Sequence, residues 1–296
     1  MPEKYLFHVP KEDHLVGLLH LRKNLFALLM EAKYLNRIAI IPSLHLNGKH
    51  NSGLSVRTTW DKFIILDNFQ SFNPFIRLSD FGDIDYNNSC IIDENIKSEL
   101  LLNESNPILV RKHTQYPNYY KLLDNFINYN WDSVLTNLIQ STDEITQHAK
   151  IAISKMKYYH CIHVRRGDKL MMKNAPGLDK KTHPDYLKRF LLNIISNGET
   201  VYIMSDEKQP NYFDSLRKSF NIYSFLDFPE FVSIEKTNNY LLFSIENEIM
   251  NNAITKIRTF KEDGYISILN YSSGGAEFIL SKLKRRLRKV SRLFFR

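Results

Sequence analysis

The chain has 296 residues, of which 43% are hydrophobic and 12% aromatic, with only ten glycines and ten prolines. This length and composition predict a globular protein of one large or two medium domains and exclude a fibrous or largely disordered chain. The two cysteines, Cys90 and Cys161, lack CxxC spacing, which argues against a disulfide framework or a zinc ribbon and fits a reducing compartment.

The net charge of +8 comes from the end of the chain. Residues 278–296 hold eight of the 40 Lys and Arg residues and no acid, so the remainder has 32 basic and 32 acidic residues. Because a nucleic-acid-binding fold usually carries a basic face, we expect no nucleic acid partner. No segment resembles a signal peptide, and no apolar run approaches the roughly 20 residues of a transmembrane helix.

The first half of the chain begins with the pattern of an α/β layer. Apolar residues at helical spacing predict a helix over 24–36, and the β-branched run 37–41 predicts a buried strand that stops at Pro42. Beyond Pro42 the pattern predicts a loop over 43–60, a strand over 63–66, a strand over 107–110, and one or two helices over 119–142.

The second half alternates strands with helices. The pattern predicts strands over 159–164, 200–204, 222–225 and 255–259, and helices over 142–155, 183–196, 210–220 and 239–253. This alternation is typical of a mainly parallel sheet wound on both faces, whose ligands bind beyond the C-terminal ends of the strands. His163–Lys169 follows one predicted strand and Ser205 and Asp206 follow another, so we expect a ligand site there.

The segment His163–Lys169 has the sequence HVRRGDK. The guanidinium groups of Arg165 and Arg166 suit phosphate oxygens, and fixed cations stabilise the charge that develops on a diphosphate leaving group. Asp168 can hold an arginine in place, and Lys169 adds a third cation. The alternative is an ordinary surface pair of arginines bound to acids, which the position at a strand end disfavours.

Asp206 offers a carboxylate at the end of a second strand. A carboxylate there matches the paired N–H donors of a guanine edge and would favour guanosine nucleotides. The alternative is the N-cap of a following helix. A D-x-D sequence at Asp83–Asp85 suggests a metal site, but it lies away from the basic segment, and we expect a solvated loop.

Three parts of the sequence resemble the fucosyltransferase superfamily that includes α1,6- and α1,2-fucosyltransferases and protein O-fucosyltransferases. His163–Lys169 resembles the family's H-V-R-R-[TG]-D-K segment, with His183–Tyr186 downstream resembling H-P-x-x-Y. Val201–Glu207 resembles V-Y-[LI]-A-[ST]-D-[DE], and Gly17–Arg22 with the following L-N, strand and Pro is similar to the O-fucosyltransferase opening. The resemblance spans about residues 15–260.

The resemblance implies a GT-B fold of two Rossmann-like α/β domains with mainly parallel sheets, GDP-fucose as donor, inversion at the anomeric carbon, and no metal or other cofactor. We expect an acceptor-side domain over 1–145, a GDP-sugar-binding domain over 146–277 and a tail over 278–296. The implied roles are β-phosphate binding by Arg165 with support from Arg166, a guanine site lined by His163 and Asp206, and a pyrophosphate and acceptor region shaped by Asp168 and Lys169.

Arg165 and Lys169 are the expected catalytic residues. The expected donor-binding set also includes Arg22, Ser205, Glu246 and Thr259, although Glu246 alternatively lies on a solvated helix face. The sequence departs from the family at Thr259–Glu262, which reads TFKE in place of T-F-S-S, and it lacks an acid after Lys169 to match the proposed base of the α1,6 enzymes. His20, Asp179 and Glu262 are the candidates for a general base.

Apolar residues recur every three or four positions in the tail, with cations on the other face. This pattern predicts a basic amphipathic helix that holds the protein on an anionic membrane surface; a solvated helix or a nucleic-acid-binding tail are the alternatives. Together, these observations predict a cytoplasmic, peripherally membrane-associated, inverting fucosyltransferase with a glycan or glycolipid acceptor. The alternatives are a GDP-sugar transferase with another donor sugar, a nucleotide- or glycan-binding pseudoenzyme and a nucleic-acid-binding protein.

Overall fold

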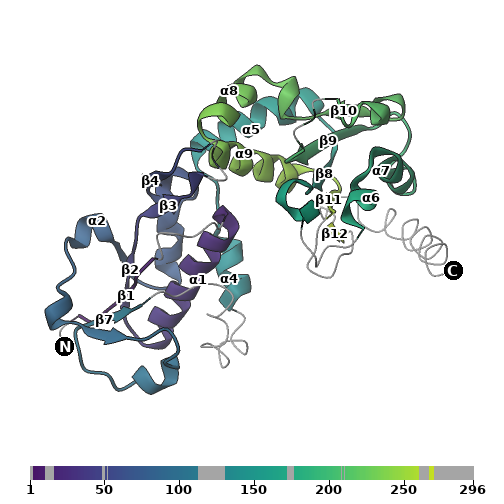
Figure 1. Ribbon diagram of the computed structural model, residues 1–296. Coiled ribbons are helices and arrows are strands. Elements are labelled where there is room, and N and C mark those ends of the chain that lie inside the picture. The colour runs from purple at the N-terminus through teal and green to yellow at the C-terminus, as the bar shows by residue number, and fades with distance from the viewer. Residues whose placement is uncertain are drawn as a thin grey trace. The chain divides into compact units, whose positions relative to one another are not determined.

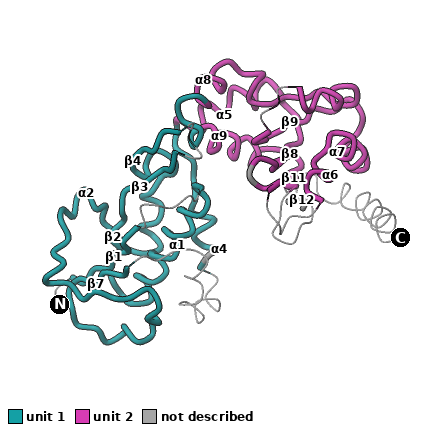
Figure 2. The backbone as a smooth tube through the Cα atoms, viewed as in Figure 1, with its two compact units in different colours: residues 1–143, 236–241 teal, residues 144–235, 242–296 magenta. Residues whose placement is uncertain are grey.

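The computed structural model describes residues 3–10, 17–48, 51, 53–112, 131–171, 177–207, 209, 211–259 and 267–269. The chain forms two compact units, residues 1–143 with 236–241 and residues 144–235 with 242–296 (Figure 2). The first unit thus includes the segment 236–241, which the sequence pattern assigned to the second domain. The tail helix expected over 278–296 lies outside the described residues.

The first unit is built on a five-stranded parallel sheet in the order β5-β2-β1-β7-β6 (Figure 1). Its strands are β1 (Tyr5–His8), β2 (Ile38–Ile41), β5 (Phe75–Arg77), β6 (Cys90–Ile92) and β7 (Ile108–Arg111). A hairpin of β3 (Leu44–Leu46) and β4 (Val56–Thr58) is antiparallel. The helices are α1 (Leu18–Tyr34), α2 (Leu78–Phe81) and α4 (Trp131–Leu138).

Helix α1 packs on β1 and β2 and starts earlier than the expected residue 24. Its residues 25–32 are all buried, including the acidic Glu31. The helix ends at Tyr34, and Asn36 then adopts a left-handed conformation with φ of 52° that turns the chain into β2. The predicted helix and strand are therefore confirmed, with the helix extended at its N-terminus.

The strand predicted over 63–66 is wrong. These residues link two short 3-10 helices, η2 (Trp60–Lys62) and η3 (Leu66–Ser71), and make only an isolated bridge from Ile64 to Ser141. Trp60, Phe63, Ile64 and Leu66 are all buried, so the apolar run reflects burial on several sides and not a strand period. The predicted loop over 43–60 also differs, because it contains β3 and β4.

The second unit is built on a sheet in the order β10-β9-β8-β11-β12, parallel except for β12. Its strands are β8 (His160–Val164), β9 (Thr200–Ser205), β10 (Asn221–Tyr223), β11 (Lys256–Arg258) and β12 (Ser267–Leu269). The helices of this half of the chain are α5 (Asp143–Met156), α6 (Leu178–Thr182), α7 (Pro184–Leu191), α8 (Pro229–Thr237) and α9 (Asn239–Asn252). The predicted strands are confirmed to within a few residues.

Two helices of this half differ from the prediction. The helix expected over 183–196 ends at Leu191, and the one expected over 210–220 is only the 3-10 helix η8 (Asp214–Lys218). Both pack against one face of the sheet, where Ile162, Val201 and Ile203 form a buried core with α7 and η8. On the other face, Tyr202 donates a hydrogen bond to Glu246 of α9.

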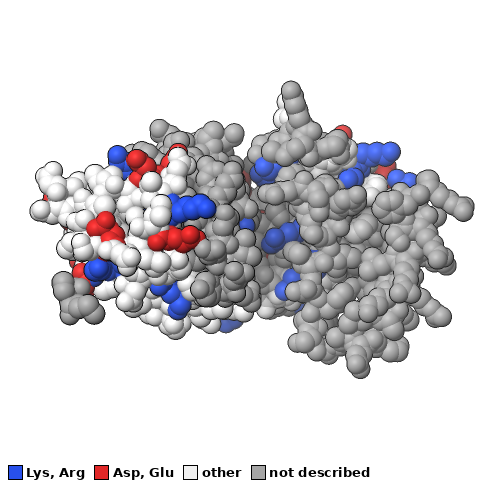
Figure 3. Space-filling view, turned by 90° about the horizontal axis from the view of Figure 1, so that it is seen from below, with Lys and Arg blue, Asp and Glu red and all other residues white. Residues whose placement is uncertain are grey.

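Charged side chains of both signs share the described surface. On the left-hand part of the face shown in Figure 3, Lys and Arg lie among Asp and Glu. Within the part of the chain that the structure describes, no helix is long and apolar enough to cross a membrane.

Candidate functional site

The residues that follow β8, β9 and β11 lie at the switch point of the second sheet. Strands β9 and β10 extend this sheet on one side of β8, and β11 and β12 extend it on the other. In such sheets the connections leave the two central strands in opposite directions, which opens a crevice for ligands beyond the carboxyl ends. The segment His163–Lys169 begins within β8 and continues into the 3-10 helix η7 (Gly167–Met171) at this edge.

Arg165 and Asp206 form an ion pair across the ends of β8 and β9. Arg165 Nη1 donates to Asp206 Oδ2, and the backbone N–H of Arg166 donates to Asp206 Oδ1 at 2.6 Å. Both paired side chains keep 25% of their surface exposed, so the pair is accessible from solvent. Asp206 is not a helix N-cap, because the next helical turn begins only at Asp214. The structure thus joins two residues that are 41 positions apart in the sequence.

Gly167 makes room for this ion pair. Its φ of 23° lies in the left-handed region, and a Cβ atom on it would come within 2.5 Å of Asp206 Oδ2. A side chain at this position would therefore both strain the backbone and displace the carboxylate. Glycine in the HVRRGDK segment is explained by the close approach of Asp206.

Arg166 is buried and bound within the protein. Its Nε donates to Glu207 at 2.6 Å, and its terminal nitrogens donate to Thr182 at 2.6 Å and to Asp179 at 2.7 Å. The guanidinium also lies 4.4 Å from the centre of the Tyr212 ring. Since its donors are committed to these partners, Arg166 fixes the loop after β8 and leaves Arg165 as the exposed arginine of the pair. The sequence analysis missed these partners, because they belong to three separate segments.

Ser205 and Thr259 join the strand ends. Ser205 Oγ donates to the carbonyl of Val164 at 2.8 Å, which ties β9 to β8. The Thr259 hydroxyl donates to the carbonyl of His163 at 3.2 Å and accepts from the N–H of Arg165 at 3.1 Å. Thr259 is only 1% exposed. Its hydroxyl therefore positions the backbone of Arg165, and its contact with the donor stays a prediction.

His163 is a neutral group beside two cations. Burial, together with the charges of Arg258 and Arg165, lowers the pKa of His163 to about 3. Arg258 ends β11 and pairs in register with His163 across the two parallel strands. At neutral pH the positive charge at this edge therefore comes from the arginines and not from the imidazole.

The other expected site residues include Asp168 and Lys169, which follow the two arginines, and Arg22, which lies in α1. Lys169 lies in η7 and is partly exposed, whereas the side chain of Asp168 lies outside the described residues. The next residue, Leu170, is 36% exposed, and Met171 is 88% exposed. Arg22 belongs to α1 of the first unit, so its part in a donor site stays a prediction.

Glu246 lies in the interior of the second unit and not on a solvated helix face. It is 5% exposed and accepts a hydrogen bond of 2.9 Å from the hydroxyl of Tyr202. Burial raises the pKa of Glu246 to about 8, against a smaller lowering by that hydrogen bond. The solvated-face alternative for Glu246 is therefore wrong, and its contact with the donor stays a prediction.

The candidates for a general base also have defined surroundings. Asp179 forms an ion pair with Arg166, and His20 is exposed on α1, whereas Glu262 lies outside the described residues. In the first unit, Asp85 accepts hydrogen bonds from the N–H groups of Asn87 and Asn88 and caps a 3-10 helix. Among the described residues, no group of three or more His, Cys, Asp or Glu side chains is arranged to hold a metal ion.

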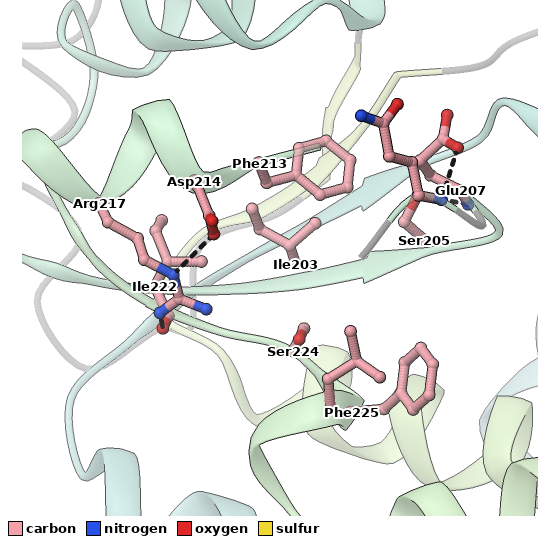
Figure 4. Close-up of a pocket in the computed structure, with 11 residues that line it drawn as sticks. Ile203, Ser205, Glu207, Phe213, Asp214, Arg217, Ile222, Ser224 and Phe225 are labelled. Atoms are coloured by element: carbon pink, nitrogen blue, oxygen red, sulfur yellow. Dashed lines mark hydrogen bonds and ion pairs between the residues drawn. The ribbon is translucent and has the colours of Figure 1, made fainter. Parts of the chain in front are cut away.

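A small pocket lies at the ends of β9 and β10 (Figure 4). Ser205 at the end of β9 and Glu207 just after it line the pocket, and Phe213 and Phe225 lie on either side of Ile203 and Ser224 in Figure 4. Arg217 lines the far end and is held by Asp214 at 3.2 Å. This pocket could not be predicted from the sequence, because Phe213 and Phe225 come from separate segments before and at the start of short 3-10 helices, where aromatic residues look like ordinary core positions.

Comparison with known proteins gives relatives by fold alone. No family model and no curated protein matches the sequence. POFUT1 in complex with GDP-fucose has a TM-score of 0.55 and 10% identity, covering 84% of this chain and 95% of that chain. POFUT1 in complex with GDP has a TM-score of 0.54 and 10% identity, with coverage of 86% and 96%. The fucosyltransferase NodZ from Bradyrhizobium has a TM-score of 0.50 and 9% identity, with coverage of 91% and 99%.

The protein therefore has the GT-B-like fold of these fucosyltransferases. The predicted mixed α/β architecture of two Rossmann-like sheets with mainly parallel strands is confirmed. The likeness covers nearly all of the compared proteins, so both units belong to the shared fold.

Proposed function

We propose that this protein is a glycosyltransferase that transfers fucose from GDP-fucose to a hydroxyl group of a glycan. The observation that carries the proposal is the position of Arg165, an accessible arginine at the switch point of a fold shared with proteins crystallised with GDP-fucose. An arginine there suits the diphosphate of a nucleotide sugar, because ligands of such sheets bind at that crevice.

The proposed reaction inverts the anomeric carbon and needs no metal. The acceptor oxygen bonds to the anomeric carbon as the bond from that carbon to the β-phosphate oxygen breaks. The acceptor proton passes to a general base, and GDP leaves with both bonding electrons. Arg165 stabilises the charge on the departing phosphate more in the transition state than in the bound donor, which lowers the barrier.

The surroundings of Arg165 support this role. Its backbone N–H is held by Thr259 and its side chain is paired with Asp206, so it is oriented before the donor arrives. The neutral His163 next to it adds no repulsion or attraction of its own. The pocket lined by Phe213 and Phe225 offers apolar surface of the kind that contacts a nucleoside, and the carboxylate of Glu207 in its lining offers an acceptor for an N–H group of guanine.

The decisive experiment is a donor screen with purified full-length protein. GDP-fucose, GDP-mannose, GDP-glucose and UDP-sugars are supplied with a pool of glycan acceptors, and released nucleotide is measured. We expect release from GDP-fucose above all others, and binding of GDP but not UDP in calorimetry. Release of nucleotide from a different GDP-sugar would mean that the protein is a glycosyltransferase with another donor sugar. The absence of GDP binding would refute the proposal.

A second candidate function is a nucleotide-binding protein without transferase activity. Two observations favour it. The hydroxyl of Thr259 already forms hydrogen bonds with backbone groups of His163 and Arg165, and the side chain of Arg165 is paired with Asp206. This candidate predicts tight binding of GDP with no release of nucleotide from any donor in the same screen.

For the acceptor we propose a glycan linked to a lipid, reached from the cytoplasmic face of a membrane. The proposal rests on the amphipathic pattern of residues 278–296 and on their eight basic residues. Each such charge contributes about 1 kcal/mol near an anionic surface. Deleting residues 278–296 should abolish flotation with vesicles that contain phosphatidylserine, while turnover on a soluble acceptor is preserved; unchanged flotation would contradict the proposal.

A further inference from the structure

Arg258 lies at the same edge of the second sheet as Arg165, but on the neighbouring strand β11. It is the last residue of β11, and its Cα pairs in register with that of His163 on β8. Strand β11 lies beside β8 on the side away from β9 (Figure 1). The two arginines therefore flank the carboxyl end of β8, with Arg165 continuing the strand and Arg258 coming from its neighbour.

The Arg258 side chain has no acidic partner within the part of the chain that the structure describes. Its Nε atom is buried without any hydrogen-bond partner, and among the described residues no carboxylate forms an ion pair with it. Burial lowers the pKa of its guanidinium. Holding a half-buried cation without a counter-charge destabilises a fold, so such a group calls for an explanation in terms of a ligand or a constraint.

The first unit shows what a partnered arginine looks like at the equivalent point. Arg111 ends β7 and pairs in register with His8, the last residue of β1. There Glu31 binds the guanidinium through both carboxylate oxygens, and Arg111 Nη1 donates to the carbonyl of Ile96 at 2.8 Å. The strand next to the central strand thus ends in an arginine bound by a carboxylate in the first unit and, among the described residues, in one without a carboxylate partner in the second.

We propose that Arg258 binds the diphosphate of the nucleotide sugar, from the side of the crevice opposite Arg165. This inference rests on the proposed function, because it assigns a second residue to the same donor. A diphosphate carries several negative charges, and guanidinium groups bind phosphate oxygens through paired N–H donors. The diphosphate supplies a counter-charge that no described residue provides to Arg258.

The test compares two substitutions on the same strand. Arg258→Met removes the guanidinium, and Lys256→Met removes one positive charge two residues earlier, on the same face of β11 and further from the carboxyl end. Binding of GDP, GMP and guanosine to the full-length proteins is measured by calorimetry, and melting temperature by calorimetric scanning.

We expect Arg258→Met to lower the affinity for GDP by about 10- to 100-fold, the range expected for a hydrogen bond to a charged group. The affinity for guanosine should not change. The melting temperature without ligand should rise, because an unpaired buried charge is removed. Lys256→Met should change neither the affinity for GDP nor its ratio to guanosine. Arg258→Lys should recover part of the lost affinity.

Three results would overturn the inference in distinguishable ways. If the wild-type protein binds no GDP, the proposed function fails and this inference with it. If the wild type binds GDP and Arg258→Met binds it equally well, the inference alone is wrong. If Arg258→Met weakens GDP and guanosine to the same degree and lowers the melting temperature, Arg258 is a structural residue.

Discussion

At the switch point of each sheet, a histidine and an arginine lie side by side on parallel strands. In the first unit these are His8 and Arg111, and in the second they are His163 and Arg258. In the first unit the buried Glu31 receives hydrogen bonds from His8 at 2.8 Å and from Arg111, and Ser98 adds another at 2.6 Å. In the second unit no described carboxylate reaches Arg258. The same edge of the sheet thus holds an arginine bound by a buried carboxylate in the first unit and, among the described residues, an arginine without a carboxylate partner in the second.

The two buried glutamates show the same contrast. Although burial raises the pKa of Glu31, hydrogen bonding from His8 and the charge of Arg111 outweigh it and hold this pKa at about 2. For Glu246, the effect of burial on the pKa is larger than that of the hydrogen bond from Tyr202, the only such bond to its side chain among the described residues. Its pKa therefore rises to about 8. A buried acid next to an arginine therefore stays ionised, and one without an arginine stays protonated.

The largest effect is expected at Glu31. Glu31→Gln removes the counter-charge of Arg111, and breaking a buried pair in this way should cost about 3–5 kcal/mol in the free energy of unfolding. Urea denaturation at pH 7 measures it. The double variant Glu31→Leu with Arg111→Met removes both charges and should recover most of the loss. A single variant as stable as the wild type would show that the closed arrangement in the first unit does not depend on charge.

The next effect concerns turnover at the open site. Arg165→Ala should reduce transfer by about 10²- to 10³-fold, or about 2.7–4 kcal/mol, as found when one preorganised donor to a developing charge is removed. Initial rates of nucleotide release from GDP-fucose measure it. Arg189→Ala, which alters an exposed arginine of α7, is the matched control and should leave the rate unchanged. An active Arg165→Ala protein would remove Arg165 from the mechanism.

Thr259 links stability to the position of Arg165. Thr259→Val leaves a buried carbonyl and a buried N–H without their hydroxyl partner, which should cost about 1–3 kcal/mol in unfolding free energy. Turnover should fall as well, because the N–H of Arg165 is no longer held. Thr259→Ser keeps the hydroxyl and should restore turnover even if some packing is lost. Equal turnover in Thr259→Val and wild type would argue against this positioning role.

The smallest effect is expected at Glu246, and it depends on pH. Its folded pKa of about 8 lies above its ordinary value of 4.5, so the folded state binds the proton more tightly, and stability falls as pH rises from 4.5 through 8. Glu246→Gln should change stability by less than about 1 kcal/mol at pH 6, where the wild-type acid is already neutral. At pH 9 the variant should be the more stable protein. Melting temperatures of the wild type and the variant at both pH values test this prediction. The same difference in melting temperature at pH 6 and pH 9 would mean that Glu246 does not titrate in this range.

The sequence was sufficient to locate the second sheet and the segment that follows β8. The strand over 160–164 has the sequence HCIHV, and its last two residues begin the HVRRGDK segment, so the strand pattern and the chemistry pointed to the same place. Strands β1, β5 and β6 have only three or four residues each, which is too short for an alternating pattern to stand out. No strand was therefore predicted from the sequence within residues 1–10 or 68–106.

The different roles of the site residues could not be predicted from the sequence. Arg165 and Arg166 are neighbours of the same type, and only the fold shows that one is bound by Glu207, Asp179 and Thr182 while the other remains accessible. The pairing of Arg258 with His163 is set by strand register over 95 positions, and no local spacing encodes it. The resemblance also gave no sign that Thr259 and Glu246 are buried, and their predicted contacts with the donor stay predictions.

The exposed thioether of Met171 gives the protein an internal footprinting probe. It lies two residues after Lys169 and is 88% exposed, whereas Met30, Met156, Met204 and Met250 are each at most 5% exposed. Brief treatment with hydrogen peroxide should therefore convert Met171 to its sulfoxide well before those four. Mass spectrometry of the peptide that contains it then reports, without any engineered label, whether a nucleotide sugar or an acceptor shields this turn of the chain.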